Sequence, residues 1–185
     1  MKTTRKNFGE LCKVFRILAA VCEVFMIVGA AMYLINAIWL LTIGNTSIQL
    51  GSISFHAPFI SVKSEQFAAE VQILCLITMV TLFLVCLFAK KIFSKLEKSE
   101  TPFIPELPAK IYAIGLTLII GTGASIILRI ISELVAGFNN ADVNTDSLYN
   151  AGLDSSVMII GAFLLALSYV FEHGLKLQQE SDETL

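Results

Sequence analysis

Charged side chains are scarce in this chain, and their scarcity excludes an ordinary soluble domain. Asp, Glu, Lys and Arg make up 15% of the residues, where a soluble domain has about 25%. Apolar residues make up 56%, and so little polar surface cannot enclose a core of that size in water. Lipid is therefore expected to cover much of the surface.

Residues and motifs that carry enzyme chemistry are also few. His56 and His173 are the only histidines, and they do not form an HExxH zinc motif. A GxSxG nucleophile motif and a glycine-rich phosphate loop are absent as well. We therefore expect no enzymatic activity and no cofactor or metal.

Four apolar stretches are long enough to cross a hydrocarbon layer, which takes about 20 residues. They cover residues 15–43, 67–89, 111–138 and 153–175. Helices are expected because a helix satisfies its own backbone polar groups in lipid. The first stretch is longer than the roughly 7–15 apolar residues of a signal peptide, which indicates an uncleaved anchor. The sequence predicts an all-α membrane protein, a four-transmembrane-helix bundle forming one domain over residues 1–185.

Basic residues predict the orientation of the helices, because short cytoplasmic loops are rich in Lys and Arg. Eleven of them lie before the first stretch or in its first turn, between the second and third, or after the fourth: Lys2, Arg5, Lys6, Lys13, Arg16, Lys90, Lys91, Lys95, Lys98, Lys110 and Lys176. Lys63 is the one basic residue in the other loops. Both termini, the loop 90–110 and the tail 176–185 are therefore predicted to be cytoplasmic, and the loops 44–66 and 139–152 external.

The four cysteines show no pattern of a disulfide or a metal site. They are Cys12, Cys22, Cys75 and Cys86. None lies in a predicted external loop, and no CxxC spacing occurs. We expect them to pack as small apolar residues.

The first external loop, 44–66, has the pattern of a β-hairpin. Apolar residues alternate with polar ones in two short runs, at Ile48 and Leu50 and at Ile53 and Phe55. The two residues between the runs suit a tight turn. A small β-hairpin is predicted here.

Two motifs on the predicted cytoplasmic side are similar to those of a known family. The loop sequence LEKSETPFIPELPAKIYAIG contains a TPF segment at Thr101, Pro102 and Phe103. The C-terminal sequence SYVFEHGLKLQQESDETL contains a G-x-x-LQ-x-E-x-D-x-T pattern at Gly174, Leu177, Gln178, Glu180, Asp182 and Thr184. With these motifs the chain resembles a bacterial membrane family catalogued as domain of unknown function family 2975. The resemblance implies a four-span protein of the bacterial cytoplasmic (inner) membrane, whose gene often neighbours one for a small helix-turn-helix regulator.

Polar residues within the spans suggest an outer cluster. An ionisable group in a span costs roughly 2.5–3.5 kcal/mol on insertion scales, so it normally faces protein or water. Five residues share a similar outer depth: Asn36, Glu70, Arg129, Glu133 and Asp154. Thr122, Ser125 and Ser132 share the helical stripe of Arg129. One interpretation is a structural clasp in which Glu70 or Glu133 neutralises Arg129; the other is a small outward pocket for an ion or polar ligand.

A second polar group is expected at the inner ends of the spans, at Glu23, Glu172 and His173. Histidine titrates near neutral pH, so a pairing of Glu23 with His173 would suit a proton relay or pH sensor. The alternative is an interfacial histidine and a neutral, hydrogen-bonded carboxyl. Small residues four apart, Gly121 with Ser125 and Ala162 with Ala166, also suggest close helix contacts.

Two functions fit these features. The first is a regulatory or interaction protein whose middle loop and tail bind a cytoplasmic regulator protein, without direct nucleic-acid binding. The candidate docking residues are Thr101, Pro102, Phe103, Gln178, Glu180 and Asp182. The second is a small transporter, channel or immunity-type protein that uses the outer cluster and forms a homo-oligomer. The sequence leaves the ligand and the oligomeric state open.

Overall fold

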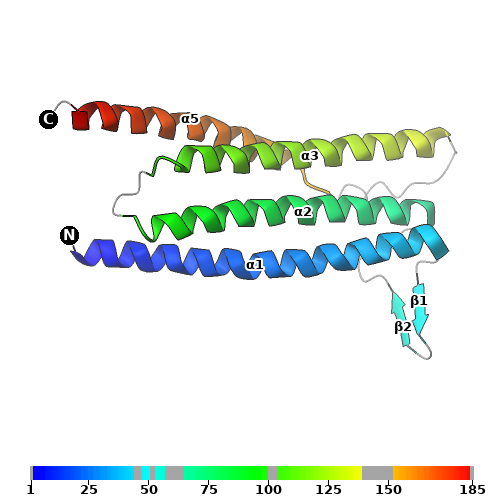
Figure 1. The fold of residues 1–185 in the computed structure, drawn as a ribbon. Helices are drawn as coiled ribbons and strands as arrows, with labels where there is room; N and C mark the ends of the chain where they lie inside the picture. Colours follow the sequence, from blue (N-terminus) through cyan, green and yellow to red (C-terminus); the bar gives the residue numbers. More distant parts are fainter. Residues whose placement is uncertain are drawn as a thin grey trace. The chain divides into compact units, whose positions relative to one another are not determined.

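The computed structural model describes residues 2–43, 47–50, 53–56, 65–99, 104–138 and 152–183. Four long helices account for most of them (Figure 1): α1 (Lys2–Ile43), α2 (Glu65–Leu96), α3 (Leu107–Phe138) and α5 (Ser155–Glu183). Two short strands, β1 (Ser47–Leu50) and β2 (Ile53–His56), follow α1 in the chain.

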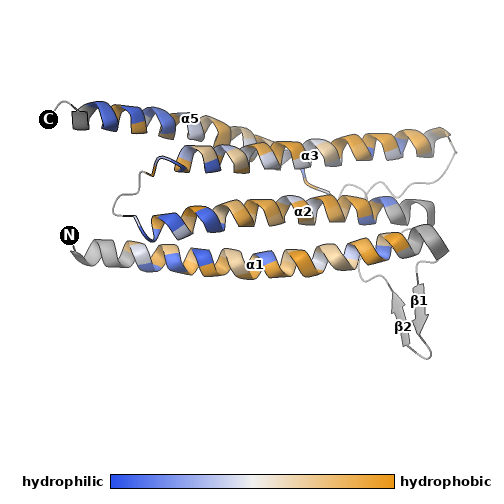
Figure 2. Cartoon of the chain, viewed as in Figure 1, coloured by the Kyte–Doolittle hydropathy of each residue, from blue (hydrophilic) through white to orange (hydrophobic). Residues whose placement is uncertain are grey.

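Each long helix has a segment long and apolar enough to cross a membrane: Phe8–Ile38, Glu70–Leu96, Leu107–Val135 and Ser155–Glu180. Figure 2 shows hydrophobic residues along much of every helix and hydrophilic ones at the end of α2 and along the last turns of α5. Large apolar side chains such as Phe25 and Ile159 are 70% and 73% exposed. Such exposure suits lipid rather than water. The prediction of a multi-pass membrane protein with four helices is confirmed.

The helices extend beyond the apolar stretches that predict them. α1 begins at Lys2 rather than near residue 15, and α2 continues to Leu96 rather than ending near residue 89. Hydropathy identifies the part of a helix that suits lipid, whereas the basic residues at these ends also favour helix. α3 begins at Leu107, with Pro108 in its first turn, where a helix tolerates the missing proline N–H.

The strands β1 and β2 pair antiparallel, with Ser47 opposite His56 and Leu50 opposite Ile53. They coincide with the two alternating runs of the sequence. The residues between them, 51–52, lie outside the described part of the chain.

The chain divides into two compact units. The first unit contains Met1–Phe25, Thr81–Ile120 and Ser156–Leu185, and the second contains Met26–Val80 and Gly121–Ser155. Each of the four helices contributes a segment to the first unit, which contains all of α5 except Ser155.

In the first unit, aromatic and charged side chains join α1 to α2. The rings of Phe15 and Phe93 stack with their centroids 5.2 Å apart. Just beyond the end of α2, Glu97 Oε2 lies 3.3 Å from Arg16 Nε. This pairing fixes which face of α1 meets α2, and that face includes Glu23.

In the same unit, α3 and α5 meet backbone to backbone. A Cβ added at Gly115 would lie 2.7 Å from the carbonyl oxygen of Gly161, and one added at Gly161 would lie 2.9 Å from the carbonyl oxygen of Gly115. Ser168 on α5 also donates a 2.8 Å hydrogen bond to the carbonyl oxygen of Pro108. The pair Ala162 and Ala166 expected from sequence does not make this contact, since both residues are exposed.

Candidate functional sites

Glu23 in the first unit pairs with a lysine of α2. The residue is 9% exposed, and Lys90 Nζ lies 2.6 Å from Oε2. The hypothesis that Glu23 pairs with His173 is therefore wrong. α1 packs on α2 in this unit, whereas α5 packs on α3, and His173 is exposed. Glu172 on α5 instead pairs with Lys176, at 3.0 Å.

Four lysines of the first unit surround a cavity of about 570 Å³. Lys90, Lys91 and Lys95 come from the end of α2, and Lys110 comes from the start of α3. Glu23, Leu87 and Ser94 complete its wall. In the sequence, these lysines indicate the orientation of the helices and nothing more. The i, i+4 spacing of Lys91 and Lys95 indicates a shared face, but nothing in the sequence predicts that Lys110 joins them.

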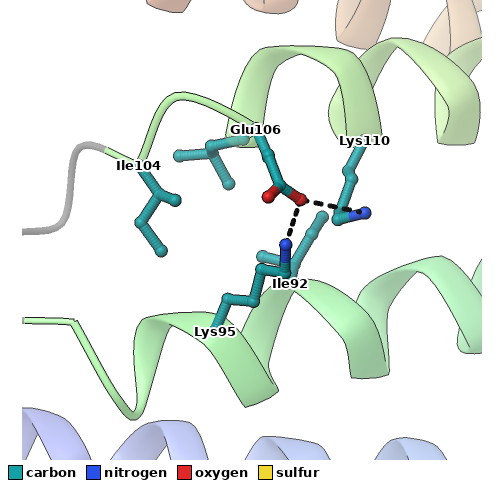
Figure 3. A pocket seen from close by; sticks show the side chains of 6 residues that line it. Ile92, Lys95, Ile104, Glu106 and Lys110 are labelled. Carbon is teal, nitrogen blue, oxygen red and sulfur yellow. Dashed lines mark hydrogen bonds and ion pairs between the residues drawn. The ribbon is translucent and has the colours of Figure 1, made fainter.

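Glu106 connects the segment before α3 to α2. Its carboxylate accepts a hydrogen bond from Lys95, and its Oε2 lies 3.7 Å from Lys110 Nζ (Figure 3). The hydrogen bond from Lys95, then the charges of Lys95 and Lys110, hold the pKa of Glu106 below its ordinary value. Because the side chain is exposed, this ion pair is sensitive to salt.

The lowered pKa predicts how Glu106 contributes to stability at different pH. A depressed pKa in the folded state stabilises the protein above the unfolded value of about 4.3, and this contribution disappears as pH falls through the folded value. We expect Glu106→Gln to lower the melting temperature at about pH 7 and to match wild type at about pH 3. Thermal unfolding of both proteins at the two pH values checks this. Glu10→Gln, at an exposed residue of α1, is the control. If Glu106→Gln lowers the melting temperature equally at both pH values, the ion-pair explanation is contradicted.

A second hollow of about 470 Å³ lies between α5 and the start of α3, together with Pro105 just before it. One side contains Pro105, Pro108, Ala109 and Tyr112, and the other contains Ser168, Tyr169, Glu172, Leu175, Lys176 and Gln179. The hydrogen bond from Ser168 to Pro108 crosses between these two sides. The start of α3 and the second half of α5 therefore form one continuous surface.

Of the candidate docking residues that the structure describes, none is among those that line this hollow. Thr101, Pro102 and Phe103 belong to the segment that is not described. Gln178 and Glu180 are exposed on α5, and Asp182 lies in its last turn. Sequence reasoning did not identify Tyr112 and Tyr169, the two tyrosines that line the hollow, because an isolated tyrosine in an apolar stretch has no distinguishing pattern.

Arg129 is the buried cation of the second unit. Its side chain is 8% exposed, and Nη2 donates a 3.3 Å hydrogen bond to the carbonyl oxygen of Leu153. A Cβ added at Gly152 would lie 2.6 Å from the same nitrogen, so the guanidinium packs directly on backbone. The polar stripe beside it on α3 is buried too, at Thr122, Ser125 and Ser132.

The other members of the outer cluster occupy different environments. Arg129 contacts the residue before Asp154, and Asp154 itself is exposed. Glu133 is exposed, so it lies off the buried stripe that carries Arg129. Asn36 and Glu70 are half-buried, and Glu70 Oε2 is enclosed without a hydrogen-bond partner. In the part of the chain that the structure describes, no three His, Cys, Asp or Glu side chains gather as metal ligands.

Comparison with known proteins extends the similarity seen in the two motifs. The family described as "Protein of unknown function (DUF2975)" matches residues 58–185. The matched range contains α2, α3 and α5, together with the loop and tail motifs. The chain has no significant match among curated proteins or among solved structures.

Proposed function

The chain belongs to the DUF2975 family of proteins of unknown function, and from this membership we propose that it is a non-enzymatic regulatory protein that binds a cytoplasmic protein. The proposal places it in the bacterial cytoplasmic membrane, with both termini and the middle loop in the cytoplasm. The basic residues of the loop and the N-terminus support this orientation. The proposed partner is a small helix-turn-helix regulator, the kind of neighbour that the family resemblance implies.

The hollow between the start of α3 and α5 is the observation that carries the proposal. It combines two prolines, Pro105 and Pro108, with Tyr112, Tyr169 and the polar residue Gln179. Tyrosine is enriched at protein interfaces because it offers apolar area and a hydrogen-bonding group together. The hollow, with a volume of about 470 Å³, would admit two or three side chains of a partner.

Capture of the regulator by the full-length protein in detergent tests the proposal. We expect Tyr169→Ala to reduce the retained regulator about tenfold, as the loss of an anchoring aromatic does at many interfaces. Removal of residues 177–185 should have a similar effect. Leu177→Ala is the matched control, because Leu177 is exposed on the same helix but does not line the hollow. Equal capture by wild type, Tyr169→Ala and the truncated protein would contradict the proposal.

The second unit favours another candidate function, a small oligomeric transporter or channel. Its support is Arg129, a buried cation in an apolar helix beside buried Thr122 and Ser125. Intramembrane charges often mark an ion or solute path. Ion flux into proteoliposomes would be lost in Arg129→Gln and retained in Arg129→Lys if this function holds. No flux through the wild-type protein would exclude it for the ions tested.

A further inference from the structure

The lysine-lined cavity of the first unit has an excess of positive charge. Four lysines line it, and Glu23 is its one lining carboxylate, which leaves a net charge of +3. Counting Glu106, which is bonded to Lys95, the net charge is still +2. Cations held this close repel one another, so an anion in the cavity would stabilise the arrangement.

The lysines differ in how far they are already neutralised. Lys90 is paired with Glu23, and Lys95 and Lys110 share the carboxylate of Glu106. Lys91 is exposed and makes no ion pair with any residue that the structure describes. Its ammonium group is therefore the one most available to a ligand.

The cavity also lies where polar and apolar surfaces meet. Lys90, Lys91 and Lys95 fall in the last turns of the membrane-spanning segment of α2, and Lys110 falls in the first turn of the segment of α3. Leu87 forms part of the wall, and Leu84, one turn away on the same face, is 36% exposed. A ligand in this cavity would meet the four lysines and Leu87, with Leu84 next along the helix face.

We propose that this cavity binds the phosphate of an anionic phospholipid headgroup. Basic pockets at the cytoplasmic ends of membrane helices bind such headgroups, and about 570 Å³ accommodates a glycerophosphate. Lys91 is the principal contact, and Lys110 is the second from the opposite wall. This site is separate from the proposed docking hollow, with which it shares no lining residue.

Lipid binding to the purified full-length protein in neutral detergent tests the proposal. The probes are short-chain phosphatidylglycerol, short-chain phosphatidylcholine and inorganic phosphate. We expect saturable binding of phosphatidylglycerol, no binding of phosphatidylcholine and much weaker binding of inorganic phosphate. Each lysine near an anionic lipid surface is worth about fivefold in affinity. Lys91→Gln should therefore weaken phosphatidylglycerol binding about fivefold, and Lys91→Gln combined with Lys110→Gln about 25-fold.

Two further variants separate a site from general charge attraction. Lys98→Gln removes an exposed lysine close in the chain that does not line the cavity, so it should change affinity less than twofold. Lys91→Arg keeps the charge and should restore binding. Equal losses in Lys98→Gln and Lys91→Gln would overturn the proposal, as would equal binding of the two lipids. Inorganic phosphate that binds as tightly as phosphatidylglycerol would assign the cavity to a soluble phosphate compound and overturn the lipid assignment. None of these outcomes depends on whether the regulator binds.

Discussion

Gly161→Ala is expected to destabilise the contact between α3 and α5 by about 1–3 kcal/mol, the usual cost of overpacking a close contact. The added methyl would lie 2.9 Å from both the carbonyl oxygen of Gly115 and Cγ1 of Ile119. A backbone oxygen moves only if its helix moves, so the two helices would have to separate. The melting temperature of the purified protein in detergent measures the effect.

Gly123→Ala on α3 is the matched control for this substitution. A Cβ at Gly123 meets nothing within 4 Å, and alanine favours a helix interior over glycine by about 0.5–1 kcal/mol. The control should therefore be neutral or stabilising. Gly115→Ala should resemble Gly161→Ala, because its Cβ meets the opposing carbonyl. A Gly161→Ala protein that melts as high as the Gly123→Ala protein would show that the helices do not meet at these glycines.

Arg129→Ala is expected to lower stability by about 1.5–3 kcal/mol, the range for a hydrogen bond that involves a charged group. The substitution removes the donor to the carbonyl oxygen of Leu153 and leaves space in a buried part of the second unit. Arg129→Lys keeps the positive charge but lacks the planar guanidinium group, so it should recover part of the lost stability. Unfolding in denaturant measures both. If Arg129→Ala unfolds like wild type, Arg129 has no structural role, and the transport hypothesis becomes the better account of its burial.

Gly152 provides an independent check on the position of the guanidinium. Gly152→Ala places a methyl 2.6 Å from Nη2 of Arg129, so it should be destabilising in the wild-type background. In an Arg129→Ala background the methyl has room, so Gly152→Ala should lower the stability much less than it does in the wild-type protein. Coupling of this kind is typical of residues in contact. Strictly additive effects would place the guanidinium away from Gly152.

Much of the fold follows from composition and length. Long apolar stretches predict four helices because lipid leaves the backbone no partner but itself, and each stretch coincides with a described helix. The helix ends are harder to predict. Residues such as Lys2 and Leu96 lie beyond the apolar stretches, and their helical state depends on local propensity and packing rather than on hydropathy.

The contacts between helices could not be predicted in the same way. The depth of Glu23 and His173 along their helices is similar, and depth was the basis for pairing them. Which helices are neighbours, and how each is rotated about its axis, is decided by packing. Glu23 therefore meets Lys90, a residue that a topology argument treats as a marker of the cytoplasmic side.

The close approach of α3 and α5 was missed for a related reason. A search for small residues four apart on one helix finds Gly121 with Ser125 and Ala162 with Ala166. The observed contact instead needs one glycine on each helix, Gly115 on α3 and Gly161 on α5. A pattern of two small residues four apart on one helix does not describe it. Arg129 was different: a lone cation in an apolar stretch is conspicuous in the sequence, and its burial follows from the cost of exposing it to lipid.

The two connections between α3 and α5 also fix how these helices are aligned lengthwise. Pro108 and Gly115 are seven residues apart on α3, and their partners Ser168 and Gly161 are seven apart on α5. Seven residues are two helical turns, so both connections fall on one seam. Inserting one residue between them in either helix would rotate the rest by about 100°, and one connection would have to break. An insertion of seven would keep both connections on the seam but move one partner out of reach by about 10 Å. The two segments between the connections must therefore keep equal lengths. A change in the length of one helix segment should be tolerated only when the other helix changes by the same amount.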